Sequence, residues 1–222
     1  MINKYMMAAA LFSVAGTAAA ARWQVEITNV TPGQSFTPIL AATHYGEVKV
    51  FELGTPASEE LAILAEAGDT GPLSEKLEAR RSVTSVQTLE GLLGPGQTAE
   101  IKIEARPGQR LSLAAMLVPT NDTFFAVDGV FLPLHGETSI QALGYDAGSE
   151  ANDQNCANMP GPRCGGIGAS PGPGEGDEGF VHVSNGFHDL GSADAAGNEI
   201  LAPAHYTWNN PVAIVTIRRI YH

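Results

Sequence analysis

The sequence predicts an all-β protein, an antiparallel β-sandwich that carries two short inserted helices. Short segments alternate apolar and polar residues, which is the period of a strand with one buried face. Glycine and proline, at 25 and 14 residues, recur between these segments as turn residues. With 222 residues, 44% of them hydrophobic, the chain is long enough to form one domain with its own core.

The first residues have the features of a secretory signal peptide. A lysine precedes an apolar run at residues 8–14, and small residues at 16–21 provide a cleavage site. The apolar run is too short to cross a bilayer, and no later run has the necessary length. We therefore expect a signal peptide at residues 1–21, a single mature domain at residues 22–222, no transmembrane segment, and a secreted or periplasmic location.

Segments with strand-like alternation or β-branched content follow one another along the mature chain. They are residues 23–30, 37–44, 48–51, 82–89, 98–105, 111–118, 123–132, 138–143, 180–183 and 212–220. In residues 98–105 the alternation is regular, with alanine and isoleucine facing inward and glutamate and lysine facing outward. The Pro107-Gly108 turn that follows predicts a hairpin with the strand at residues 111–118.

Two segments change to the period of a helix, at residues 56–66 and 73–80. Ser58 followed by two glutamates is a start signal for the first helix, and the glycines and proline at residues 68–72 end it. The expected buried faces consist of Leu61, Leu64 and Ala65 in the first helix and Leu73 and Leu77 in the second. We expect both helices to cover the core of the sandwich.

Acidic side chains occur where three consecutive apolar strands end. Asp122 lies in the turn between the first and second of these strands, and Asp146 and Glu150 follow the third. Carboxylates at neighbouring strand ends repel one another unless a cation lies between them, and calcium is the usual oxygen-bound cation outside the cell. The pattern predicts a calcium site at Asp122, Asp146 and Glu150. Asp128 and Asp153 are further candidates, as nearby acids that reach the ion through water.

The same stretch resembles a known family. Residues 116–129 read MLVPTNDTFFAVDG and residues 145–150 read YDAGSE. Together they are similar to the spondin domain family, which includes the N-terminal domains of F-spondin and mindin and secreted bacterial proteins built from this domain alone. The family motifs are Pro-x-Asp-aromatic-x-x-Gly and Trp-Asp-Ala-Gly-Thr-Asp. The resemblance covers about residues 23–220.

This resemblance implies a variant of the calcium-dependent membrane-binding sandwich and a role in extracellular contacts. It also implies that Asp122, Asp146 and Glu150 hold the calcium ion. The chain departs from the family pattern at three positions: Thr123 replaces the aromatic residue, Tyr145 replaces tryptophan, and Glu150 replaces the second aspartate.

The two cysteines, Cys156 and Cys164, lie in one loop. A redox site requires the C-x-x-C spacing, which is absent, and a cysteine zinc site requires further cysteines. In an oxidising compartment we expect a disulfide between them. Closing so short a loop stabilises the fold by about 2 to 3 kcal/mol at most.

Histidines and a further group of acids leave alternatives open. His182, His188 and His205 are interpreted as side chains satisfied by backbone groups, although imidazole also suits zinc or copper. His44 is expected to be a hydrogen-bonded loop residue. In the Gly- and Pro-rich loop at residues 157–179, a solvated acidic face is favoured over a second cation site. These acids are Glu175, Asp177 and Glu178.

Composition and motifs limit the function. The net charge of -12 disfavours nucleic acid as a partner, because the chain repels phosphate. H-E-x-x-H does not occur, and Asp122 with Asp146 is better explained as a ligand pair than as a glycosidase pair, so we expect no enzyme. We expect a calcium-binding adhesion module whose partner is a protein or a cell-surface glycan. The first alternative is a histidine-based copper or zinc protein, and a secreted hydrolase is the less favoured one.

Overall fold

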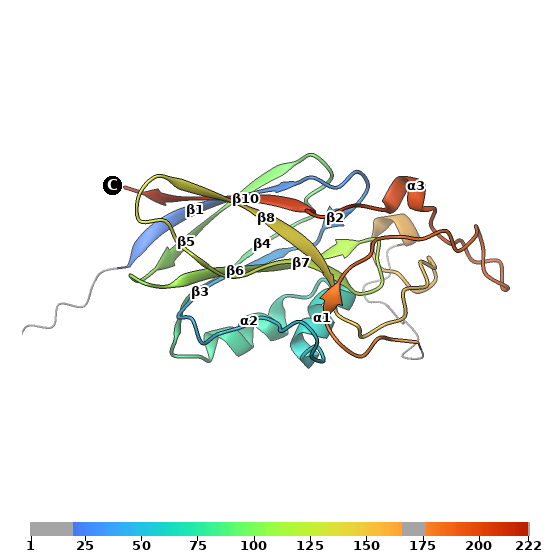
Figure 1. Ribbon diagram of the computed structural model, residues 1–222, viewed down its shortest axis with the longest axis horizontal. Coiled ribbons are helices and arrows are strands. Elements are labelled where there is room, and N and C mark those ends of the chain that lie inside the picture. The colour runs from blue at the N-terminus through green and yellow to red at the C-terminus, as the bar shows by residue number, and fades with distance from the viewer. Residues whose placement is uncertain (1–19, 166–175, 222) are drawn as a thin grey trace, which may run out of the picture.

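The body of the protein is one curled antiparallel sheet, seen in a computed structural model that describes residues 20–165 and 176–221 (Figure 1). Its strands are β1 (Ala21–Asn29), β2 (Ser35–Phe36), β3 (Ile39–His44), β4 (Val83–Leu89), β5 (Thr98–Ala105), β6 (Arg110–Val118), β7 (Thr123–Phe131), β8 (Glu137–Asp146), β9 (His182–Val183) and β10 (Ala213–Ile220). Hydrogen bonds link them in the order β4-β3-β6-β7-β8-β10-β1-β5, while β2 pairs with β6 and β9 with β8. The two end strands, β4 and β5, lie against each other, which gives the predicted sandwich.

Strand β8 belongs to both layers of the sandwich. Its first part pairs with β10, up to Ala142 opposite Ala213. Its last part pairs with β7, where Asp146 lies opposite Thr123. The final residues of β8 also pair with β9. The end of β8 therefore lies between β7 and β9, two strands that are far from each other in the sequence.

Two clusters of buried side chains form the core. The larger cluster lies between the layers and includes Val25, Phe125 and Val215. The second lies between the outer face of β3, β6 and β7 and the helices, and it includes Phe124 and Leu64. Neighbouring residues of β7 therefore enter different clusters. This burial on both faces is why β6 and β7 read as nearly continuous apolar runs.

Helices α1 (Glu59–Ala67) and α2 (Gly71–Glu78) cover this outer face, below the sheet in Figure 1. The side chain of Ser58 accepts a hydrogen bond from the N–H of Leu61, as expected of an N-cap residue. Gly68 ends α1 in the left-handed conformation, with φ of 68°. The five predicted apolar residues of the two helices are all buried. Two shorter helices, η1 (Pro162–Cys164) and α3 (Pro203–Tyr206), were not predicted.

The predicted hairpin between β5 and β6 is wrong. Strand β5 pairs with β1, and β6 pairs with β3 and β7, so the turn at Pro107-Gly108 carries the chain from one layer to the other. The burial patterns explain the difference. Strand β6 is buried on both faces and needs a strand on either side, whereas β5 alternates and suits the end of the order.

Other differences are local. Residues 48–51 form no strand, and Val48 and Val50 instead join the cluster under the helices. Strand β8 is longer at both ends than the predicted 138–143. Residues 1–19, which hold most of the predicted signal peptide, lie outside the described residues, as do residues 166–175 of the long loop. Within the described residues, no helix has the length and apolar character to cross a membrane.

Candidate metal centre

Strand pairing brings the predicted acids to one end of the sheet. Asp122 directly precedes β7 and Asp146 ends β8, and these two strands are neighbours. The N–H of Ala147 donates to the carbonyl of Asp122 at 3.2 Å, which joins the two loops. Both aspartates lie at strand ends, as the sequence predicts, and the pairing of β7 with β8 places them side by side.

The Asp122 side chain is fully buried, and its two oxygens differ. Oδ2 accepts the backbone N–H of Ser149 at 2.8 Å and of Glu150 at 3.0 Å, and the Ser149 hydroxyl at 3.2 Å. Oδ1 is buried and makes no hydrogen bond to any described residue. Burial, and then the charge of Asp146, raise the pKa of Asp122 to about 8 despite the two backbone donors. The site is thus costly to ionise without a cation.

Asp146 is also buried, with 1% of its surface exposed. Its Oδ1 accepts the N–H of Gly148 at 2.8 Å and its Oδ2 accepts Nδ2 of Asn152 at 2.9 Å. Burial raises its pKa, and these two hydrogen bonds oppose the shift. Gly148 has φ of 66°, and a Cβ there would lie 2.3 Å from the carbonyl oxygen of Phe180. Only glycine therefore allows this loop to close beneath Asp146.

Glu150 is buried as well, and its backbone N–H binds Asp122. After burial and Asp146, the charge of Glu150 also raises the pKa of Asp122, so all three predicted acids belong to one electrostatic group.

The two further candidates have other contacts. Asp128 accepts the N–H of Val50 and the Ser112 hydroxyl. Asp153 accepts from Nδ2 of Asn121 and from the N–H of Asn155, which supports the loop next to the site.

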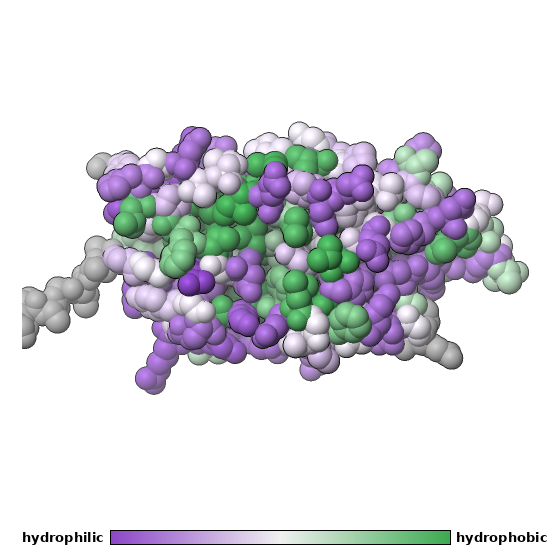
Figure 2. Space-filling view, viewed as in Figure 1, coloured by the Kyte–Doolittle hydropathy of each residue, from purple (hydrophilic) through white to green (hydrophobic). Residues whose placement is uncertain are grey.

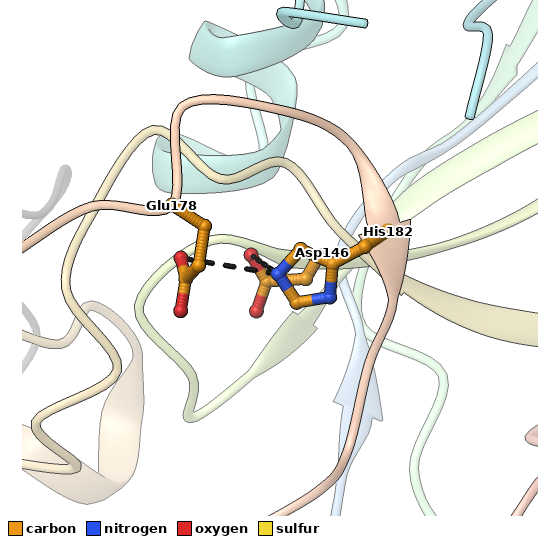
Figure 3. Close-up of side chains that lie close together, drawn as sticks. All are labelled: Asp146, Glu178 and His182. Carbon is orange, nitrogen blue, oxygen red and sulfur yellow. Dashed lines mark ion pairs between the residues drawn. The ribbon is translucent and has the colours of Figure 1, made fainter. Parts of the chain in front are cut away.

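A histidine and a glutamate that sequence reasoning had not joined to this group lie against Asp146 (Figure 3). His182 on β9 is in register with Asp146, and its Nε2 is 3.5 Å from Asp146 Oδ1 and 3.9 Å from Glu178 Oε2. Ligand atoms of these three residues all lie within 4.8 Å of one another. Among the described residues, no other set of three acids, histidines or cysteines meets that spacing. The predicted set of Asp122, Asp146 and Glu150 does not meet it either.

The three histidines of the alternative hypothesis do not converge. His188 and His205 lie outside the group around Asp146, and the described contacts of His188 are made by its backbone, to Gln154. Glu178 is exposed, as expected of a solvated face, and its side chain also approaches His182. Its only signal in the sequence is its position four residues before a histidine at the start of a short strand.

The predicted disulfide between Cys156 and Cys164 is present. Both cysteines pack against the central cluster, and the N–H of Cys156 donates to the carbonyl of Glu199 at 2.9 Å. The disulfide closes the loop that follows Glu150, and these contacts hold that loop against the body of the protein.

Comparison with known families identifies the domain. The family described as Spondin_N matches residues 25–154, more than half of the chain. The chain belongs to the spondin N-terminal domain family. In this spondin domain the match runs from β1 to the loop after β8 and includes Asp122, Asp146 and Glu150, whereas Glu178 and His182 lie beyond it. No curated protein matches the chain.

Proposed function

We propose that this spondin-domain protein is secreted or periplasmic and acts as a calcium-dependent binding module at the cell surface or in the matrix. The observation that carries the proposal is Asp122 Oδ1, a buried carboxylate oxygen that accepts no hydrogen bond from the part of the chain that the structure describes, beside a second buried carboxylate. Oxygen ligands of this kind suit calcium. The residues present therefore fit the ion that the family resemblance implies.

The proposed ligands are Asp122, Asp146 and Glu150, with backbone carbonyls and water completing about six to eight oxygens. When bound, calcium supplies the positive charge that these acids otherwise obtain only by taking up protons. The donors to Asp122 Oδ2 and to Asp146 already hold both carboxylates in place. The ion would thereby hold the loop before β7 against the loop after β8.

The partner is proposed to bind at this loop end. Hydrophobic residues in Figure 2 gather mainly over the strands, whereas the loop end at the right of the view is mostly hydrophilic. A polar, cation-ordered set of loops suits a protein or a cell-surface glycan as partner and requires no catalytic group.

Thermal unfolding with calcium or with a chelator tests the site. Excess calcium is expected to raise the melting temperature in a concentration-dependent manner, with binding at about 0.1 to 1 mM. Asp122→Asn and Asp146→Asn should each reduce this shift. The control Asp177→Asn, at an exposed position, should keep it. Identical melting curves in calcium and chelator for the wild type would refute the proposal.

A further inference from the structure

We infer that Asp146, Glu178 and His182 form a second metal site, one that takes a transition-metal ion such as zinc. The three side chains come from the end of β8, from the loop before β9 and from β9, and Figure 3 shows them pointing toward one another. The site uses Asp146 in common with the proposed calcium site, but its other two ligands are its own. It therefore does not depend on calcium binding.

The hydrogen bonding of His182 prepares its Nε2 to bind a metal. Nδ1 lies 3.0 Å from the carbonyl oxygen of Val183, and because a carbonyl only accepts, Nδ1 carries the proton. In the neutral ring Nε2 then has a free lone pair. Nε2 is buried, makes no hydrogen bond to the described residues, and faces two carboxylates. This backbone bond to the distal nitrogen is the usual support for a metal-bound histidine.

Asn152 orients the two carboxylates in the same way. Its Nδ2 donates to Oδ2 of Asp146 at 2.9 Å and to Oε1 of Glu178 at 3.2 Å. The other oxygens, Oδ1 of Asp146 and Oε2 of Glu178, are the ones nearest to His182, and Oδ1 also accepts the N–H of Gly148. One amide thus leaves one oxygen of each carboxylate directed toward the imidazole.

Spacing and ligand type indicate the class of ion. Zinc bonds of about 2.0 to 2.2 Å in a tetrahedral site place ligand atoms about 3.3 to 3.6 Å apart. The 3.5 Å between Asp146 Oδ1 and His182 Nε2 lies in that range, and the 3.9 Å to Glu178 is a few tenths longer, on a side chain that is 35% exposed. Calcium and magnesium prefer oxygen alone, whereas an imidazole with carboxylates suits zinc. Three protein ligands leave a position for water.

Zinc titration of the full chain, followed by calorimetry, tests the inference. With calcium present, the wild type is expected to bind one zinc ion per chain. His182→Gln and Glu178→Gln should each weaken zinc binding at least 10-fold, as loss of a ligand or its support does. Cobalt substituted for zinc should give visible absorption bands in the wild type that His182→Gln lacks.

Two controls separate this site from the calcium site. His188→Gln, at an exposed histidine outside the group, should bind zinc like the wild type. Asp122→Asn should keep zinc binding while losing the calcium-dependent rise in melting temperature, and His182→Gln should do the reverse. If the wild type binds no zinc, or if His182→Gln binds it equally well, the contact between His182 and Asp146 is an ion pair only and the inference is overturned.

Discussion

A single hydroxyl links two polar side chains inside the layer that the helices cover. Ser112 Oγ is 2.8 Å from Nε2 of the fully buried His44 and donates to Oδ1 of Asp128 at 3.0 Å. It also accepts the N–H of Gly129 at 2.9 Å. The serine, not the histidine, is in the centre, which differs from the order of a catalytic triad. The expectation that His44 is hydrogen-bonded is confirmed, but it ends strand β3 instead of lying in a loop.

Ser112→Ala is expected to lower the free energy of unfolding by about 1 to 3 kcal/mol, because it leaves a buried imidazole nitrogen and a backbone N–H without their partner. Chemical denaturation monitored by circular dichroism measures the change. Ser139→Ala is the matched control, since its hydroxyl meets Thr216 on the exposed face of a strand, and it should change stability little. Equal values for the two variants would contradict the structural role of the Ser112 hydroxyl.

At the level of elements, helix α1 closes a face of the sheet that solvent would otherwise reach. Leu61, Leu64 and Ala65 are completely buried in it, against Phe124 and other residues of the same cluster. Ser58 caps the start of the helix and Gly68 ends it, so residues next to the helix determine its bounds. Its stability comes instead from the apolar contact with the sheet.

Leu64→Ala is therefore expected to lower the free energy of unfolding by about 2 to 5 kcal/mol, through lost burial and the cavity it leaves. Leu53, with 51% of its surface exposed, is the matched control, and Leu53→Ala should cost much less. Urea denaturation of both variants measures the difference. A Leu64→Ala protein as stable as the Leu53→Ala protein would show that α1 does not seal the core.

Charge affects the whole molecule. The net charge is -12, and the acids counted in it include two buried carboxylates, Asp122 and Asp146. Burial and the charge of Asp146 raise the pKa of Asp122 from its ordinary 3.8 to about 8, and burial raises that of Asp146 as well. The folded protein therefore holds protons on these groups more tightly than the unfolded chain does. Their contribution to stability is complete below about pH 4 and is lost as the pH rises toward 8.

In a chelator, the melting temperature of the wild type is expected to fall between pH 5 and pH 8 more steeply than that of Asp122→Asn. The general repulsion among surface acids acts on both proteins, so their difference isolates the buried carboxylate. Asp177→Asn should follow the wild type. Excess calcium should reduce the fall, because it binds the deprotonated acids. Parallel pH profiles for the wild type and Asp122→Asn would contradict the raised pKa.

Local patterns in the sequence were sufficient to predict many features of this protein. The strand and helix periods, the cap at Ser58 and the disulfide between Cys156 and Cys164 depend on neighbouring residues or on the compartment. Both helices, the cap and the disulfide are present, and every predicted strand except residues 48–51 forms at least in part. Acids at strand ends also follow from the local order of the chain. This is why Asp122 and Asp146 were placed correctly beside each other.

The tertiary structure decided which strands became neighbours, and with that the rest of the candidate site. A turn reverses the chain but does not select its partner, so β5 joined β1 according to which faces are buried. In the same way, only the pairing of β9 with β8 brings Glu178 and His182 to Asp146, across a loop whose composition has no period. Contacts between residues far apart in the chain depend on the packing of the whole sandwich, which no local pattern contains.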